Sequence, residues 1–129
     1  MRIEHVAMWT DDIDRLVSFY GHYFGATTGT RYVNAQKGFE SCFISFESGA
    51  RLEVMRTTTL HPVRAEPGAP RIGLAHVAIS LGSEARVDEL TEGLRTGGFS
   101  VVEGPRRTGD GYYESVVLDP DGNRIELTA

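Results

Sequence analysis

The sequence predicts an α+β fold made of two copies of one unit, and two repeated segments are the reason. The segment HVAMWTDDIDRLVSFYGHYFGA at residues 5–26 is similar to HVAISLGSEARVDELTEGLRTGGF at residues 76–99. The order of Gly, Arg, aliphatic, Glu and aliphatic residues in GARLEVM, at residues 49–55, returns in GNRIELT at residues 122–128. Because both segments recur in the same order along the chain, we infer an internal duplication.

Each copy has the pattern of a βαβββ unit. It opens on an extended run that begins with His-Val-Ala, and a segment of helical periodicity follows. In the first copy Thr10 or Asp11 can cap the helix and Gly25 can end it. In the second copy Ser83 is the candidate cap and Gly97 lies just past the end. The apolar positions that define the two helices are Ile13, Leu16, Val17, Tyr20 and Phe24, then Val87, Leu90 and Leu94.

Three short extended runs follow each helix and complete the units. They are residues 31–33, 41–46 and 51–55 in the first copy, and residues 100–102, 113–118 and 124–128 in the second. We expect a single domain over residues 1–129, in which modules 1–57 and 72–129 are joined by a Pro-rich linker at residues 58–71. A hydrophobic content of 40% is sufficient to fill the core of a domain of this length.

Composition excludes several classes of partner. A net charge of -5 argues against nucleic acid, because neutralising many phosphates requires a basic surface. No apolar stretch approaches the roughly 18 residues of a membrane span, so we expect no membrane partner. Cys42 is the only cysteine and cannot form an internal disulfide. The N-terminus lacks the features of a signal peptide, and we therefore expect a soluble cytoplasmic protein.

The repeat preserves one histidine near its start and one glutamate near its end. His5 precedes Glu53 by 53 - 5 = 48 residues, and His76 precedes Glu126 by 126 - 76 = 50 residues. Side chains alternate between the two faces of a strand, so each glutamate lies opposite its aliphatic neighbours. If the aliphatic face packs on a helix, the other face of each sheet carries a His and a Glu. When the modules pair, within one chain or across a dimer, the four side chains can converge in one cleft.

Two imidazoles and two carboxylates form a ligand set for a divalent metal such as nickel, zinc, cobalt, manganese or iron. The absence of thiolate ligands argues against a closed structural zinc site. Without a cation, two carboxylates at close range would repel each other. The alternative for each residue taken singly is an ordinary solvated position on a strand. Matched residue types at matched positions of a duplication favour the metal site.

Four motifs carry a resemblance to a known family. IEHVAMWTDDIDRLVSFYGHYFGA, ARLEVM, GLAHVAI and DPDGNRIEL resemble the vicinal oxygen chelate superfamily, which includes glyoxalase I, fosfomycin-resistance thiol transferases, extradiol dioxygenases, methylmalonyl-CoA epimerase and bleomycin-binding proteins. The resemblance covers nearly the whole chain and is closest to glyoxalase I-like proteins. It implies paired βαβββ modules that form a curved mixed sheet around a metal cleft.

The resemblance also implies residue roles and a reaction. The metal ligands of the glyoxalase I branch match His5, Glu53, His76 and Glu126, and the catalytic proton transfer falls on Glu126 and Glu53. The implied activity is that of a metal-dependent lyase or isomerase, which acts on a small oxo or hydroxy compound through an enediolate-type intermediate. The glyoxalase I site lies at a dimer interface, so we expect a homodimer with a small-molecule substrate.

Two departures argue against glutathione, and two other functions stay open. Bacterial glyoxalase I usually contacts glutathione through an Arg and an Asn, whose positions hold Trp9 and Thr57 here. A glutathione adduct would therefore lose an anion-binding guanidinium and an amide. The alternative functions are a metal-free module that sequesters a drug or metabolite, as bleomycin-binding proteins do, and a thiol transferase of the fosfomycin type.

Three further features have predictions of their own. Arg106 and Arg107 precede a Gly-containing segment that we interpret as a solvated turn, with the binding of an anionic substrate as the alternative. Trp9 and Phe43 can line a cleft, and core packing is the preferred interpretation. We expect Cys42 to be a buried small side chain and not a nucleophile, because its neighbours offer no activating charge.

Overall fold

The structure, a computed structural model, describes residues 1–61, 66–67, 69–70 and 72–129. The chain forms two compact units, Met1–Val63 and Arg64–Ala129. The predicted linker at residues 58–71 lies partly outside the described residues, which do not include 62–65, 68 and 71. The grouping of modules 1–57 and 72–129 into one domain stays a prediction.

The first unit contains one helix and a five-stranded sheet. Its elements are β1 (His5–Trp9), α1 (Ile13–Phe24), β2 (Thr27–Thr28), β3 (Tyr32–Asn34), β4 (Phe39–Ser45) and β5 (Arg51–Thr57). The strand order is β1-β5-β4-β2, and β3 also pairs with β4. β1 runs parallel to β5, and the other pairs are antiparallel. β2 and β3 both pair with β4, at successive stretches of that strand. The predicted strand at 31–33 corresponds to β3, and β2 is a second short strand along the same edge of β4.

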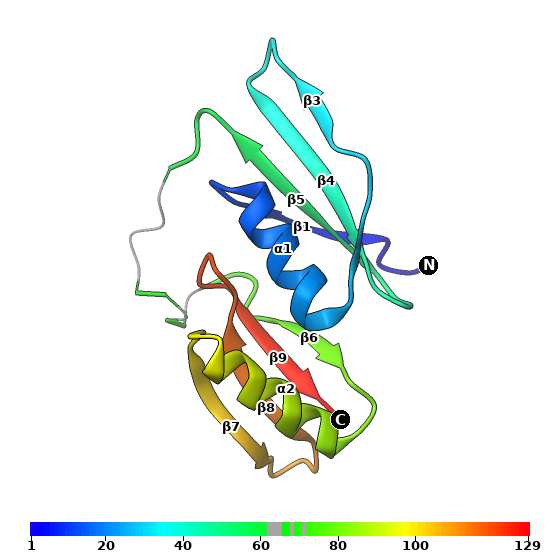
Figure 1. Ribbon diagram of the computed structural model, residues 1–129, viewed down its shortest axis with the longest axis vertical. Coiled ribbons are helices and arrows are strands. Elements are labelled where there is room, and N and C mark those ends of the chain that lie inside the picture. Colours follow the sequence, from blue (N-terminus) through cyan, green and yellow to red (C-terminus); the bar gives the residue numbers. More distant parts are fainter. Residues whose placement is uncertain (62–65, 68, 71) are drawn as a thin grey trace. The chain divides into compact units, whose positions relative to one another are not determined.

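The second unit repeats this topology with four strands. Its elements are β6 (Val77–Ser80), α2 (Glu84–Thr96), β7 (Val101–Arg107), β8 (Tyr113–Leu118) and β9 (Arg124–Thr128). The strand order is β6-β9-β8-β7, and the first strand again runs parallel to the last. Figure 1 shows one helix beside the sheet of each unit. The predicted α+β class and the βαβββ pattern are confirmed, and the predicted strand at 100–102 extends to Arg107 because its end pairs with Tyr113.

Helix α1 begins one residue later than the sequence suggested. The side chain of Asp12 accepts a hydrogen bond from the Arg15 amide at 3.0 Å, so Asp12 is the N-cap and the prediction of Thr10 or Asp11 is wrong. Thr10 instead accepts a hydrogen bond from the Asp12 amide at 3.1 Å and thereby supports the cap. Gly25 ends the helix in the left-handed conformation, as predicted, at φ 63°. Ser83 caps α2, also as predicted.

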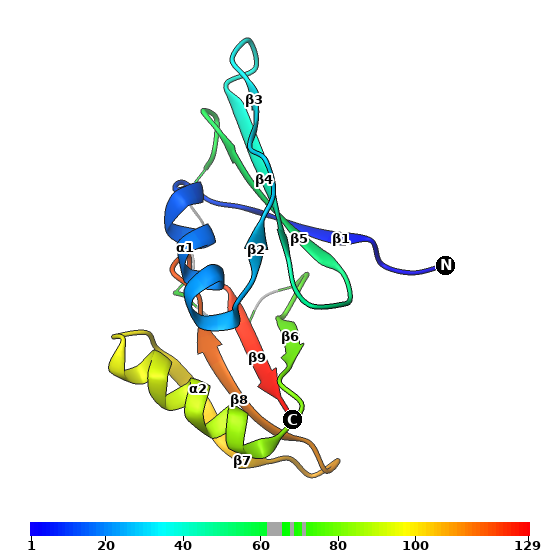
Figure 2. The same ribbon diagram turned by 45° about the vertical axis from the view of Figure 1, so that its right-hand side comes forward.

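Each helix packs on the aliphatic face of its own sheet. Leu52 and Val54 of β5 are buried in the first unit, and Ile125 and Leu127 of β9 are buried in the second. The residues between them, Glu53 and Glu126, lie on the opposite face. In Figure 1 and Figure 2, α1 lies on one side of its sheet, and no helix from the described part of that unit covers the other side. We call the side away from the helix the open face of each sheet.

A buried hydroxyl pair joins α2 to its sheet, at a position that is not among the apolar residues of the helical pattern. The side chain of Thr91 is fully buried and lies 2.6 Å from the Ser115 hydroxyl of β8, and it also donates to the Val87 carbonyl oxygen at 2.6 Å. The two hydroxyls are hydrogen-bonded to each other, which is the condition for burying them.

Among the described residues, no helix is long and apolar enough to cross a membrane.

Two glycines of the second unit should respond to alanine in opposite directions. Gly104 of β7 has φ 80°, and an added Cβ would lie 2.6 Å from the Glu114 carbonyl oxygen, so we expect Gly104→Ala to lower the free energy of unfolding by at least about 2 kcal/mol. Gly93 of α2 has open space around it, so Gly93→Ala should raise the same quantity by about 0.5–1 kcal/mol. Urea denaturation measures both. Equal effects of the two variants would contradict the close backbone approach at Gly104.

Candidate functional site

The first unit brings together two of the four predicted ligands. His5 on β1 and Glu53 on β5 lie on the open face, with 3.7 Å between Nε2 of His5 and Oε2 of Glu53. Their side chains are 40% and 19% exposed. Parallel pairing places Ala7 beside Glu53 on one side, and antiparallel pairing places Phe43 on the other. The small methyl group of Ala7 leaves room for the carboxylate to remain partly in solvent.

The second unit repeats the pair. The distance from Nε2 of His76 to Oε2 of Glu126 is 3.4 Å, and the side chains are 42% and 19% exposed. Ala78 and Val116 flank Glu126 on the neighbouring strands. Each glutamate therefore has an alanine on the parallel strand at the same register, and the duplication seen in the sequence extends to side-chain geometry.

The two distances suit ligands of one metal ion better than a hydrogen bond. An N–H···O hydrogen bond usually spans 2.7–3.2 Å. Nitrogen and oxygen ligands that each lie about 2.1 Å from one ion, roughly 90–110° apart, are about 3.0–3.4 Å from each other. Both pairs are within a few tenths of an ångström of that separation. The residues present in each unit therefore fit two positions of a metal coordination shell.

Each unit provides a pair and not a complete site. In the part of the chain that the structure describes, no group of three or more His, Cys, Asp or Glu side chains is arranged to hold a metal ion. His5 and Glu53 belong to the first unit, and His76 and Glu126 belong to the second. The convergence of all four side chains thus stays a prediction.

A charged residue that the sequence reasoning missed lies against His5. Oε2 of Glu4 is 2.5 Å from Nδ1 of His5, and the other oxygen of the carboxylate accepts a hydrogen bond from Arg51. These hydrogen bonds, first that from His5 and then that from Arg51, lower the pKa of Glu4. The guanidinium of Arg51 also lies over the ring of Phe43, 3.9 Å from its centroid. Glu4 directly precedes the predicted ligand, which is the one signal that could have drawn attention to it.

The second unit surrounds Glu126 with a different set of charges. Glu103 accepts hydrogen bonds from Arg106 at 2.8 Å and from Arg124 at 3.1 Å, and these two contacts lower its pKa. Arg106 also lies 3.2 Å from Glu114. The predicted solvated turn lies in the segment after the two arginines, where the Gly111 amide donates to the Thr108 carbonyl oxygen at 3.0 Å, whereas Arg106 and Arg107 themselves belong to β7 and pair with β8. An anion that used Arg106 would have to compete with two carboxylates.

Aromatic side chains continue the open face of the first sheet beyond His5. Trp9 is on the same face of β1 as His5 and is 50% exposed. Its ring lies edge-to-face on Phe39 with 6.2 Å between centroids, and the Phe39 ring is 6.2 Å from that of Tyr32. The preferred interpretation that Trp9 and Phe43 fill the core is therefore wrong: Trp9 is exposed, and Phe43 is half-buried with its ring edge-on to His5 at 5.4 Å.

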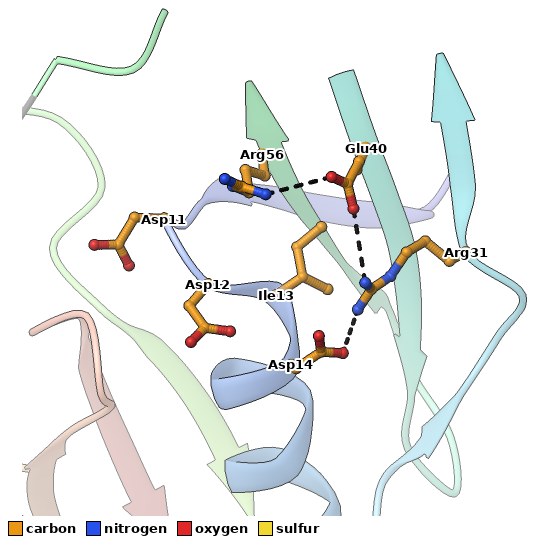
Figure 3. A pocket seen from close by; sticks show the side chains of 7 residues that line it. All are labelled: Asp11, Asp12, Ile13, Asp14, Arg31, Glu40 and Arg56. Carbon is orange, nitrogen blue, oxygen red and sulfur yellow. Dashed lines mark hydrogen bonds and ion pairs between the residues drawn. The ribbon is translucent and has the colours of Figure 1, made fainter. Parts of the chain in front are cut away.

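A polar pocket of about 270 Å³ lies at the start of α1, away from the predicted ligands (Figure 3). Ion pairs link its charged residues in a chain, in which Arg31 contacts Asp14 and lies 3.6 Å from Glu40, while Arg56 lies 3.4 Å from Glu40. The contact with Asp14 is the main reason that the pKa of Arg31 is raised. Since these charges already pair with one another, we interpret the pocket as a structural link between α1 and its sheet. It is lined by Asp11, Asp12, Ile13, Asp14, Arg31, Glu40 and Arg56.

The class of protein follows from these features, since two βαβββ units with matched His and Glu pairs define a glyoxalase-like α+β protein. The profile of the Glyoxalase/Bleomycin resistance protein/Dioxygenase superfamily matches residues 2–127, and the chain belongs to this superfamily. The resemblance predicted from the sequence motifs is thereby confirmed.

Individual relatives agree with the family and are distant. The uncharacterized protein YqjT of Bacillus subtilis (strain 168) is 26% identical over 130 residues, which cover 98% of each chain. The structure of a possible glyoxalase from Bacillus cereus has a TM-score of 0.73 at 26% identity and covers 100% of this chain and 99% of its own. The trypanothione-dependent glyoxalase I of Leishmania major has a TM-score of 0.78 at 21% identity, with coverage of 99% and 86%. At that identity the likeness shows the fold alone.

Cys42 should be inert as a nucleophile. The side chain is buried, and burial raises the pKa of the thiol, so little reactive thiolate is present at neutral pH. We expect a thiol reagent to modify the native protein on the order of 100-fold more slowly than the urea-unfolded chain. A Ser18→Cys variant, with a second thiol on the exposed side of α1, should show one fast and one slow reaction. Rapid modification of the native wild type would contradict the burial of Cys42.

Proposed function

We propose that the protein is a metal-dependent lyase or isomerase of the glyoxalase type, with a divalent ion held by His5, Glu53, His76 and Glu126. The observation that supports it is the repeated pair, in which the His and Glu atoms are 3.7 Å and 3.4 Å apart at equivalent positions of two units. A bound ion would act as a Lewis acid on a substrate oxygen. Membership of the superfamily and the likeness to proteins named as glyoxalases agree with this proposal.

The two glutamates are the proposed proton-transfer groups. A carboxylate can take the proton from the carbon next to a carbonyl and return it to the neighbouring carbon. The substrate then passes through an enediolate, and the isomerisation needs no oxidant, no reductant and no net proton. Glu53 and Glu126 remain 19% exposed, so a substrate atom can reach them from the open face. Small oxo and hydroxy compounds with a removable proton beside the carbonyl are the proposed substrate class.

The surroundings of the first pair favour a substrate with an apolar substituent. Trp9 and Phe39 line the open face beside Glu53, and Thr57 pairs with Phe39 in register. Arg51 is bound to Glu4, and Arg56 lies on the opposite face against Glu40. A carboxylate-rich thiol such as glutathione would therefore find aromatic rings where it needs cations.

The exposed aromatic residues also support a second candidate, a metal-free module that sequesters a flat apolar molecule. Trp9 and Tyr32 are 50% and 56% exposed, and both approach Phe39. Aromatic rings supply large contact areas for such a ligand. Bleomycin resistance proteins belong to the same superfamily. Metal binding separates the two candidates.

Metal content is the decisive measurement for the proposed site. We expect gently purified, untagged protein to carry about one divalent ion per set of four ligands, and we expect His76→Ala to lose it. His22→Ala is the matched control, because His22 is an exposed histidine in the last turn of α1. Elemental mass spectrometry measures the ion. Wild-type protein that stays empty after dialysis against nickel, zinc, cobalt and manganese would contradict the proposal and favour sequestration.

Replacement of the glutamates tests their role in proton transfer. We expect Glu126→Gln and Glu53→Gln to lower the rate of substrate C–H exchange in D₂O by about 10²–10⁴-fold, because the amide cannot accept the proton. NMR follows the exchange in a panel of small 2-oxo aldehydes, with and without an added thiol. Since each glutamate is also a proposed ligand, the metal content of every sample is measured alongside. Full exchange activity in both metal-loaded variants would rule out the two carboxylates as the base.

A further inference from the structure

We propose that Glu4 is a positioning residue that fixes the tautomer and ring orientation of His5, which makes His5 and His76 unequal ligands. This inference rests on the proposed metal site, since it concerns how one of the proposed ligands is prepared to bind. Its structural basis lies entirely within the first unit.

The contact between Glu4 and His5 determines which ring nitrogen carries the proton. Oε2 of Glu4 is 2.5 Å from Nδ1 of His5, and an ionised carboxylate can only accept a hydrogen bond. Nδ1 therefore carries the hydrogen in this contact. In the neutral ring Nε2 is then left with its lone pair, and Nε2 is the atom that faces Glu53 at 3.7 Å. This is the tautomer that a metal ligand at Nε2 requires.

The carboxylate of Glu4 is itself held in place, although Glu4 precedes the first residue of β1. The amide of Arg51 donates to the carbonyl oxygen of Glu4 at 3.1 Å, and the Arg51 guanidinium donates to its carboxylate. The same guanidinium lies 3.9 Å from the centroid of the Phe43 ring. Phe43 in turn meets the His5 ring at 5.4 Å with an interplanar angle of 81°. Three side chains, Glu4, Arg51 and Phe43, are thus connected to one another and to the imidazole of His5.

In the described part of the second unit, other residues occupy the positions of this arrangement. Ala75 precedes His76, and Val116 occupies the register position of Phe43. Arg124, the counterpart of Arg51, is bound to Glu103 at 3.1 Å. Glu126 is the only acidic side chain among the described residues that forms an ion pair with His76. Among the described residues, both copies therefore keep the His and Glu pair, and the carboxylate that supports the histidine is found in the first copy.

Replacing Glu4 should lower the affinity of the site for a metal ion. Outer carboxylates that receive the second N–H of a ligating histidine typically contribute about 10–100-fold to metal affinity. Removing Glu4 should cause a loss of this size. An amide at the same position keeps an acceptor oxygen and loses the charge, so Glu4→Gln should lie between the wild type and Glu4→Ala.

The experiment has two independent readouts. In metal-free, ¹⁵N-labelled protein at about pH 8, above the usual titration range of imidazole, long-range ¹H–¹⁵N NMR reports the tautomer of each histidine. We expect His5 to be protonated at Nδ1 in the wild type and in Glu4→Gln, and to become a mixture of tautomers in Glu4→Ala, with His76 unchanged. Competition with a chelator then gives the cobalt and zinc affinities. Glu47→Ala, which removes an exposed turn carboxylate, controls for the loss of charge.

Each outcome decides the proposal. A tautomer mixture and a loss of affinity in Glu4→Ala, with neither in Glu47→Ala, would support it. An unchanged His5 tautomer in Glu4→Ala would overturn it, and so would an altered tautomer with wild-type affinity. A wild-type protein that binds neither metal would contradict the proposed function, whereas the NMR of the metal-free protein would still decide whether Glu4 sets the tautomer of His5.

Discussion

The parallel pairing of the first and last strand in each unit is the constraint on which the rest of the structure depends. It places Ala7 beside Glu53 and Ala78 beside Glu126, with His5 at the start of β1 and His76 directly before β6. A shift of one residue in this register would turn the glutamate toward the helix and an aliphatic residue toward solvent. Burial of one Leu, Ile or Val stabilises the fold by about 1.5–3 kcal/mol, and burial of an unpaired carboxylate would cost several more. The core contacts of Leu52 and Ile125 therefore also determine where the polar pairs lie.

The part of the site that alternation controls could be predicted from the sequence. A strand has only two faces, so the buried aliphatic residues around Glu53 and Glu126 were sufficient to place both carboxylates on the open face. The βαβββ order of each unit could also be predicted, because the internal repeat shows the same succession of extended and helical segments twice. A large aromatic ring such as that of Trp9 usually packs in the core, whereas its position two residues from Ala7 and four from His5 places it on the open face. The alternation of side chains along β1 thus predicts the exposure of Trp9 better than its size does.

Contacts between side chains that are distant in sequence could not be predicted in this way. Glu4 and Arg51 are 47 residues apart, and only the register of β1 on β5 shows that they meet. The extension of β7 through Arg107 has a similar origin, since it depends on pairing with Tyr113 and not on the composition of the segment. The N-cap at Asp12 is supported in the same way by a side-chain contact, because the hydroxyl of Thr10 accepts a hydrogen bond from the Asp12 amide.

The two units show which features a duplicated frame retains and which it can change. Backbone pairing and the core contacts are shared, so the His and Glu atoms keep nearly the same separation, 3.7 Å and 3.4 Å. The charges around them are set by single side chains, and these differ: Glu4 supports one histidine, and Ala75 stands at the same place before the other. A pair of ligands alone binds a divalent ion weakly, because most of the coordination shell is left to water. With its histidine held in the binding tautomer by Glu4, the pair of the first unit would therefore bind an ion more tightly than the pair of the second unit.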